Sequence, residues 1–163
     1  MKKTLLTLGI VIVLVAGVFL VARHEAVLRA DQYSNIRLSD NHLLHTPSGQ
    51  VLHVRIAIGD REGELGLSHF SSLPANEGML FPFDSDAPPF WMKDMNFPLD
   101  IVWLKKISAT SFQVVSVSGN ALPSSYPAIF KATGSSDTVL EIDALESGTL
   151  GLVPGAVINL TSN

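Results

Sequence analysis

The densest stretch of the chain, residues 78–104, decides what this sequence can fold into. It contains four of the eight phenylalanines and both tryptophans, Trp91 and Trp103, together with Lys93 and Asp100. Aromatic side chains bring large apolar areas, whereas a charged group among them needs a partner once it is buried. The stretch must therefore supply the core of a domain, a binding site, or both.

Alternation of apolar and polar residues predicts a strand pair before this stretch. Segments 41–46 and 50–58 flank Pro47-Ser48-Gly49, a composition typical of a tight turn. We expect His53 and Arg55 to face outward, because side chains alternate across a strand. The even-numbered residues of the second segment are expected to face the core: Leu52, Val54, Ile56 and Ile58.

The rest of the chain predicts a mainly β fold. Asp60 stands where an N-cap would, and Glu62 and Glu64 would fall in the first turn, which predicts one short helix over 61–69. Many short strands with one short helix are typical of a compact β-sandwich or a barrel-like domain. Further strands are expected from β-branched and aromatic content over 78–83, 90–95, 99–106, 111–117, 138–143 and 156–161.

Strand parity sorts the polar groups of the central stretch. Phe90, Met92 and Asp94 would share one face of a strand, and Trp91, Lys93 and Met95 the other.

Asp100 begins a mostly apolar row in the next strand, so its carboxylate needs hydrogen bonds, from the amides of the 96–98 turn or from Lys93. Two interpretations remain open. Asp100 either anchors a turn or forms, with Lys93, the polar part of an apolar pocket whose other candidate ligand-binding residues are Trp91 and Met79.

The same stretch resembles a known family. Gly-Met-Leu-Phe-x-Phe at 78–83, Phe-Trp-Met-Lys at 90–93 and Pro-Leu-Asp-Ile at 98–101 resemble the bacterial and archaeal domain of unknown function 192, also called uncharacterised protein family 0127. The resemblance covers about residues 51–160 and implies the same mainly β fold. Weaker matches are Glu62, Gly66-Leu67, Leu73-Pro74, Val139-Leu140-Glu141-Ile142 and Gly155.

The chain departs from the family pattern at two places where the family usually has arginine. Gly63 follows the matched Glu62, and Ser68 and Phe70 occupy the family's Gly-Leu-Met-x-Arg run. If those arginines form the family's site, this chain has lost the site or rebuilt it with Arg61 or His69.

The N-terminus predicts a membrane anchor. Lys2 and Lys3 precede residues 4–22, nineteen residues without a charge, which as a helix would span roughly 28 Å of a hydrocarbon layer of about 30 Å. Residues 1–3 would then be cytoplasmic, residues 23–38 a juxtamembrane tether and residues 39–163 an extracytoplasmic domain. A cleaved signal peptide, giving a secreted protein, is the competing interpretation.

Composition excludes several classes of function. No cysteine is present, so thiol chemistry and disulfides are absent, and from residue 30 onward seven Lys or Arg stand against fourteen Asp or Glu, which argues against nucleic-acid partners. His42, His45 and His53 are too few for a typical metal site, and Asp84 and Asp86 lack the other ligands of a calcium loop. We expect no metal and no cofactor.

Two classes of function fit these observations. The favoured one is a binding or interaction module, outside the cytoplasm, for a small molecule, a glycan or an envelope protein. The alternative is an envelope hydrolase or lyase that uses Lys93, Asp94 or Asp100 as acid or base. Glu62 and Asp94 are secondary candidates for a site.

Overall fold

The computed structural model describes residues 42–162, except for the side chains of residues 60–62. The expected anchor at 4–22 and tether at 23–38 lie outside the described residues. Among residues 42–162, no helix has the length and apolar character needed to span a bilayer.

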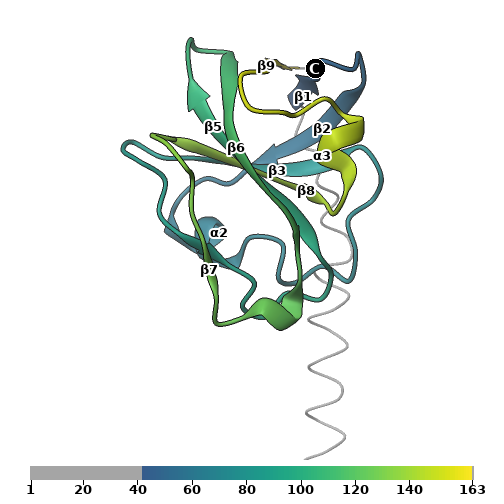
Figure 1. Ribbon diagram of the computed structural model, residues 1–163, viewed down its shortest axis with the longest axis vertical. Coiled ribbons are helices and arrows are strands. Elements are labelled where there is room, and N and C mark those ends of the chain that lie inside the picture. The colour runs from purple at the N-terminus through teal and green to yellow at the C-terminus, as the bar shows by residue number, and fades with distance from the viewer. Residues whose placement is uncertain (1–41, 163) are drawn as a thin grey trace, which may run out of the picture. The chain divides into compact units, whose positions relative to one another are not determined.

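Within the described residues, seven strands close a barrel in the order β1-β2-β3-β8-β5-β6-β9 (Figure 1). Neighbouring strands are antiparallel except β2 and β3, which are parallel and are joined through helix α2 (Asp60–Leu65). The mainly β, barrel-like fold expected from the sequence is thus confirmed. The strands are β1 (His42–His45), β2 (Val51–Ile56), β3 (Glu77–Pro82), β5 (Leu99–Lys106), β6 (Ser111–Ala121), β8 (Thr138–Asp143) and β9 (Val157–Ser162).

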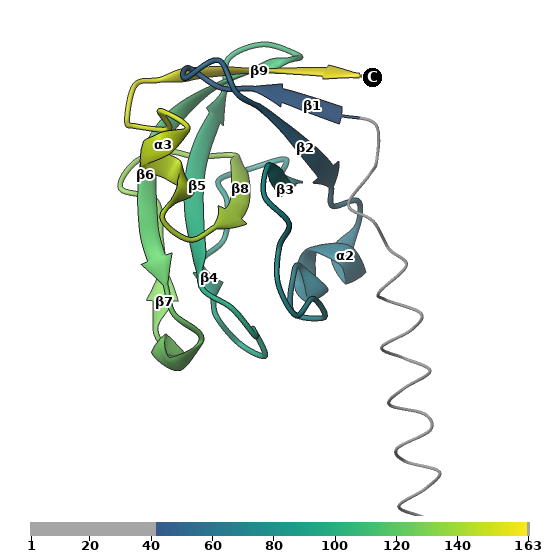
Figure 2. The same cartoon turned by 90° about the vertical axis from the view of Figure 1, so that its right-hand side faces the viewer.

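Smaller elements sit around the barrel. Strands β4 (Phe90–Trp91) and β7 (Ile129–Phe130) form a separate two-stranded sheet. The remaining elements are a 3-10 turn, η1 (Pro123–Ser125), and a short helix, α3 (Glu146–Thr149). In both views β1 and β9 lie at one end and β7 and α2 toward the other, and β4 is seen near β7 and α2 in Figure 2.

Two buried apolar clusters explain why the central strands are apolar on both faces. All seven barrel strands contribute to the inner core, for example through Leu52, Val102 and Ile158. The outer core lies on the other face of β3, β5 and β8 and includes Phe81 and Trp103. Alternate residues of β5 therefore enter different cores, and the six residues of Leu99–Leu104 are all buried.

The central stretch departs from the predicted strand over 90–95. Only Phe90 and Trp91 are extended, and the chain then turns through Asp94 at a φ of 59°, with the Met95 amide donating to the Met92 carbonyl. Strand parity therefore fails beyond Trp91. Met92 is buried, whereas Lys93 and Asp94 are both exposed.

Other differences come from element ends. Strand β2 stops at Ile56, so Ala57 is buried and Ile58, expected in the core, is 79% exposed. Helix α2 ends at Leu65 rather than at residue 69, and β6 continues to Ala121. The sequence did not predict α3 or β7.

Candidate functional site

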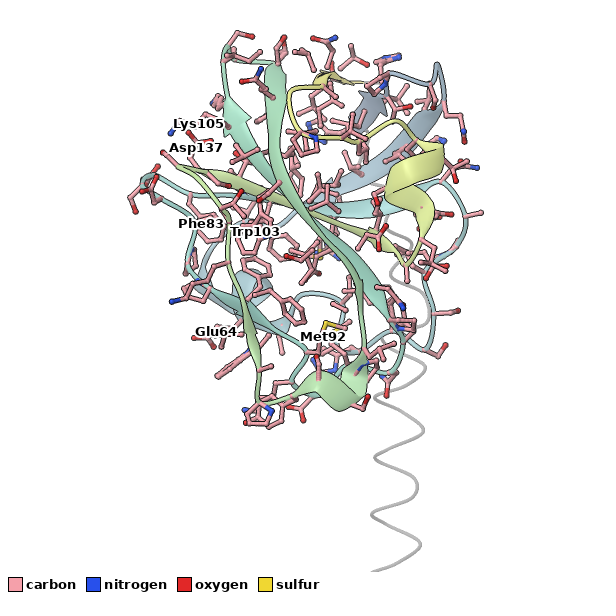
Figure 3. The ribbon with its side chains drawn as sticks, viewed as in Figure 1. Glu64, Phe83, Met92, Trp103, Lys105 and Asp137 are labelled. Atoms are coloured by element: carbon pink, nitrogen blue, oxygen red, sulfur yellow. The ribbon has the colours of Figure 1, made fainter. Side chains whose placement is uncertain are left out.

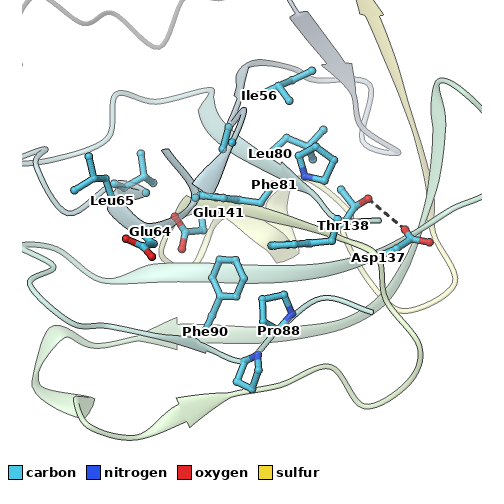
Figure 4. Close-up of a pocket in the computed structure, with 18 of the residues that line it drawn as sticks. Ile56, Glu64, Leu65, Leu80, Phe81, Pro88, Phe90, Asp137, Thr138 and Glu141 are labelled. Atoms are coloured by element: carbon cyan, nitrogen blue, oxygen red, sulfur yellow. Dashed lines mark hydrogen bonds between the residues drawn. The ribbon is translucent and has the colours of Figure 1, made fainter. Parts of the chain in front are cut away.

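A groove of about 1500 Å³ opens between α2 and the barrel. Its lining comes from α2 and the loop after it, from β3, from the 83–89 loop, from β4 and the turn after it, and from β8 (Figure 4), with further residues from β2, β5, β6 and β9. These segments are distant in sequence and meet because β8 lies between β3 and β5 in the barrel. Ligand-binding sites are usually concave, so this groove is our candidate for a ligand-binding site.

Aromatic rings form one wall of the groove. Phe90 contacts three other rings edge-to-face, with centroid distances of 5.4 Å to Phe81, 6.2 Å to Phe83 and 5.6 Å to Trp103. Trp103 is fully buried, and its indole Nε1 donates to the Ser118 hydroxyl at 3.1 Å. Since Trp103 is held in this way, the Phe90 ring has a fixed support beside the groove.

Glu141 of β8 brings a carboxyl group to the groove. It pairs in register with Met79 of β3 and Ile101 of β5, and it shares its face of β8 with Val139 of the outer core. Its side chain is 6% exposed, and its Oε2 atom has no hydrogen-bond partner among the described residues. Burial raises the pKa of Glu141 to about 8, so the carboxyl is mostly protonated at neutral pH.

The loop after α2 passes close to this carboxyl group. Gly66 has a φ of +46°, and a Cβ built on it would lie 3.6 Å from Glu141 Oε2 and 3.6 Å from Phe81 Cζ. The loop therefore passes close to the carboxyl without donating a hydrogen bond to Oε2. Glu64, from α2, lines the same groove and lies on the Glu141 side of it in Figure 4.

An ion pair marks the other part of the groove. Lys105 Nζ lies 2.8 Å from Asp137 Oδ2, and the Lys106 amide donates to Asp137 Oδ1 at 2.8 Å (Figure 3). Partial burial opposes ionisation of Asp137, but the hydrogen bonds from Lys105, from the Lys106 amide and from Thr138, together with the charge of Lys105, outweigh it and lower the pKa of Asp137. The charges of Lys105 and Asp137 therefore compensate each other, whereas Glu141 Oε2 has no such partner among the described residues.

Asp100 lies on the opposite face of the sheet from Glu141, and it is not among the residues lining the groove. Its Oδ1 accepts from the amides of Asn120 at 2.8 Å and Leu145 at 3.0 Å, and its Oδ2 accepts from the amide of Ser147 at 2.9 Å. Burial opposes its ionisation, but the hydrogen bonds from the Ser147 side chain and the three amides lower the pKa of Asp100.

Backbone amides hold the Asp100 carboxylate, as expected, but the expected donors were wrong. The sequence pointed to the amides of the 96–98 turn or to Lys93. The observed donors belong to the end of β6 and to the start of α3, where Asn120 and Leu145 have φ angles of 51° and 68°. Asp100 ties these two strained turns together.

The other predicted residues are only partly brought together. Trp91 is 53% exposed, lies edge-on to Tyr126 at 5.9 Å, and has Lys93 Nζ 5.8 Å from its ring centroid. Trp91, Lys93 and Asp94 line the groove, whereas Met79 is buried in the outer core. The side chain of Glu62 lies outside the described part of the structure.

The histidines considered for a metal site do not converge. His45 Nε2 pairs with the Thr161 hydroxyl at 3.0 Å, and His53 is exposed on β2. Among residues 42–162, no group of three His, Asp or Glu side chains is arranged to hold a metal ion.

Glu141 was the residue that sequence reasoning did not select. The sequence could have pointed to Glu141, because it is the single charged residue within Val139–Ile142, a run that is buried on both faces of the sheet. A charged residue inside such a run requires either a partner or a function.

Comparisons with known proteins agree with the architecture. The sequence profile of DUF192, described as an uncharacterised ACR, matches residues 43–160. A crystal structure of a protein of unknown function from Novosphingobium aromaticivorans is 29% identical, with a TM-score of 0.61, and the match covers 72% of this chain and 82% of that one. A putative transcription regulator from Sinorhizobium meliloti is 28% identical, with a TM-score of 0.61 and coverage of 74% and 91%. No curated protein matches the chain.

Proposed function

The chain belongs to the DUF192 family of uncharacterised proteins, and we propose that its barrel is a binding module that takes a small organic ligand into the groove between α2 and the barrel. One observation carries this proposal. Glu141 places a carboxyl that is 6% exposed, with Oε2 unpartnered among the described residues, in the lining of an aromatic groove.

The energetics support a ligand as the missing partner. Leaving a buried polar group without a hydrogen bond costs about 1–3 kcal/mol, and an apolar side chain of similar size at the same place would cost nothing of this kind. A group held at such a cost in a cleft is a candidate for function. Convergent polar groups in a mostly apolar pocket are how proteins orient small ligands.

A hydrolase or lyase remains the second candidate function. The observation that favours it is the raised pKa of Glu141, which suits a general acid at neutral pH. Of the three residues first considered for this chemistry, Asp100 fits less well, because it lies on the opposite face of the sheet from the groove and is held there by three backbone amides. Binding is favoured over catalysis because Lys105 and Asp137 are already paired with each other.

Transcription regulation, the role suggested for the Sinorhizobium relative, does not extend readily to this chain. Nucleic-acid binding relies on clustered cations that neutralise phosphates. From residue 30 onward this chain has twice as many acidic as basic residues, fourteen against seven. We therefore keep a small organic molecule as the partner.

The location of the domain is part of the proposal. The nineteen uncharged residues 4–22, behind Lys2 and Lys3, support insertion into the cytoplasmic membrane with residues 39–163 outside. A ligand of the groove would then be a molecule of the cell envelope or the medium.

A fragment titration tests the binding function. The ¹⁵N-labelled protein, in a nonionic detergent, is titrated with cationic, neutral and anionic fragments, and amide shifts are followed. The proposal predicts saturable shifts at Phe83, Phe90 and Glu141, with the same fragments bound by Glu77→Gln, a control outside the groove lining. Shifts confined to other surfaces, or none at all, would contradict it.

A further inference from the structure

We propose that the groove takes an organic cation, whose ammonium group lies between the Glu141 carboxylate and the rings of Phe83 and Phe90. This inference rests on the proposed function, because it names the chemical class of the ligand for the same groove.

The missing partner of Glu141 is the first reason to expect a cation. The strand neighbours of this carboxyl, Met79 and Ile101, are apolar, and the Gly66 loop approaches it without donating a hydrogen bond. An ammonium group would supply the opposite charge that makes an ionised buried carboxylate tolerable. A neutral ligand could accept the hydrogen bond of the protonated acid, so the preference for a cation over a neutral ligand rests on the aromatic wall and on the charge of the lining.

The aromatic wall is the second reason. Phe83 and Phe90 are only partly buried and both line the groove, while Trp103 supports Phe90 from behind. The face of an aromatic ring carries negative charge density and attracts cations within about 6 Å of its centroid. Rings combined with a carboxylate are suited to an ammonium group that has apolar substituents.

The charge of the lining is the third reason. The groove has three lysines, and one of them, Lys105, is paired with Asp137. A second, Lys93, lies over the Trp91 ring. An acidic lining attracts cations and repels anions. Six acidic residues line the groove: Glu64, Asp84, Asp86, Asp94, Asp137 and Glu141. With Asp137 paired to Lys105 and Glu141 mostly protonated, four acidic residues remain against two lysines, Lys93 and Lys106.

Binding of the cation is coupled to release of one proton. The protonated Glu141 loses its proton to solvent, and the resulting carboxylate forms an ion pair with the ammonium group, so no other reactant is needed. The other titratable groups that line the groove with Glu141 are Glu64 and His69 on the α2 side, Asp84 and Asp86 in the 83–89 loop, Lys93 and Asp94 after β4, Lys105 and Lys106 of β5, and Asp137 before β8. Glu141→Gln removes the proton exchange of Glu141 alone and leaves all of these groups in place.

The test compares two probes of similar size and shape, tetramethylammonium and tert-butyl alcohol. Each is titrated into the full-length ¹⁵N-labelled protein in a nonionic detergent, with Glu141→Gln and Glu77→Gln measured alongside. We expect tetramethylammonium to shift the amides of Phe83, Phe90 and Glu141. Its affinity should fall at least about tenfold in Glu141→Gln, since a buried charge pair has lost one partner, and should not change in Glu77→Gln.

A pH series supplies a second readout. Between pH 6 and pH 7 the affinity of the wild-type protein for tetramethylammonium should rise by about tenfold, because the carboxyl must lose its proton first. Glu141→Gln should show no such rise.

The outcomes separate the two proposals. If tert-butyl alcohol or another neutral fragment binds in the groove as well as tetramethylammonium, or if Glu141→Gln binds the cation unchanged, the cation inference is wrong and the binding function stands. Shifts at Trp91 and Tyr126 without any at Glu141 would also overturn the inference. If no probe or fragment reaches the groove, both proposals fall.

Discussion

Replacing Glu141 with glutamine should change how the stability of the barrel depends on pH. Glutamine keeps the size and most of the shape of the side chain but cannot ionise. The wild-type carboxyl has a pKa of about 8 in the folded protein, against an ordinary value of 4.5. The folded state holds this proton more tightly than the unfolded state. Ionisation of Glu141 therefore leaves the free energy of unfolding unchanged below pH 4.5 and lowers it progressively as the pH rises toward 8.

The size of this pH effect follows from the interval between the pKa values of Glu141 in the unfolded and folded states. Each pH unit between the two pKa values removes about 1.4 kcal/mol from the free energy of unfolding. Between pH 5 and pH 7 the wild-type protein should therefore lose roughly 2 to 3 kcal/mol through Glu141, and Glu141→Gln should lose none of it. All other titrating groups are common to both proteins and cancel in the difference.

Urea unfolding at pH 5, 6, 7 and 8 measures this difference. A chain that begins at residue 38 is suited to the assay, because both apolar cores lie within residues 42–162. The free energy of unfolding of Glu141→Gln should rise relative to that of the wild type steadily from pH 5 to pH 8, whereas that of Glu77→Gln should follow the wild type. Parallel profiles for Glu141→Gln and wild type would refute the reasoning, since they would mean that Glu141 is solvated or already paired.

Three other measurements address separate parts of the chain. Asp100→Asn should lower the free energy of unfolding by about 1–3 kcal/mol at pH 7, because the charge on the acceptor of three amides is lost. The pKa of Asp100 is lowered in the folded state, so its charge stabilises the protein fully above the ordinary pKa of an aspartate and less as the pH falls below it. The stability difference between wild type and Asp100→Asn should therefore shrink when urea unfolding is repeated at lower pH. A difference that does not change with pH would argue against a charged anchor. Gly78→Ala should lower the free energy of unfolding by about 1–3 kcal/mol in thermal or urea unfolding. The added Cβ would lie 3.0 Å from the Glu141 carbonyl oxygen and 3.1 Å from Ile142 Cγ2. An unchanged unfolding midpoint would show that β8 can move. The protein isolated from its native host should retain residues 4–22 and sediment with membranes, as N-terminal sequencing and fractionation would report, whereas a soluble chain beginning near Arg23 would indicate a cleaved signal peptide.

Much of the fold could be predicted because the barrel strands carry strong local patterns. The limits of β5 and β8 match the predicted segments 99–106 and 138–143, since β-branched and aromatic residues continue through both. The segment 90–95 could not be assigned in this way. Its composition suits a strand, but Asp94 takes a left-handed conformation that composition does not reveal.

The site was harder to predict than the fold, because its contacts are distant in sequence. The need of Asp100 for amide donors was clear from its apolar row, yet the donors lie 20 to 47 residues further along the chain. Glu141 was visible only as one charge in a buried run. Its importance depends on the absence of a hydrogen-bond donor to Oε2 among the described residues, and a missing hydrogen bond cannot be read from sequence.

The most direct test of the central claim is a titration of the Glu141 carboxyl itself. The ¹³C shift of its carboxyl carbon is followed from pH 4 to pH 10, in the free protein and in the presence of saturating tetramethylammonium, with Glu141→Gln used to assign the signal. We expect a midpoint near 8 in the free protein and a clearly lower midpoint once the cation is bound, because an opposite charge favours the ionised form. A midpoint near 4.5 without ligand, or a raised midpoint that the cation leaves unchanged, would contradict the claim that Glu141 awaits a cationic partner.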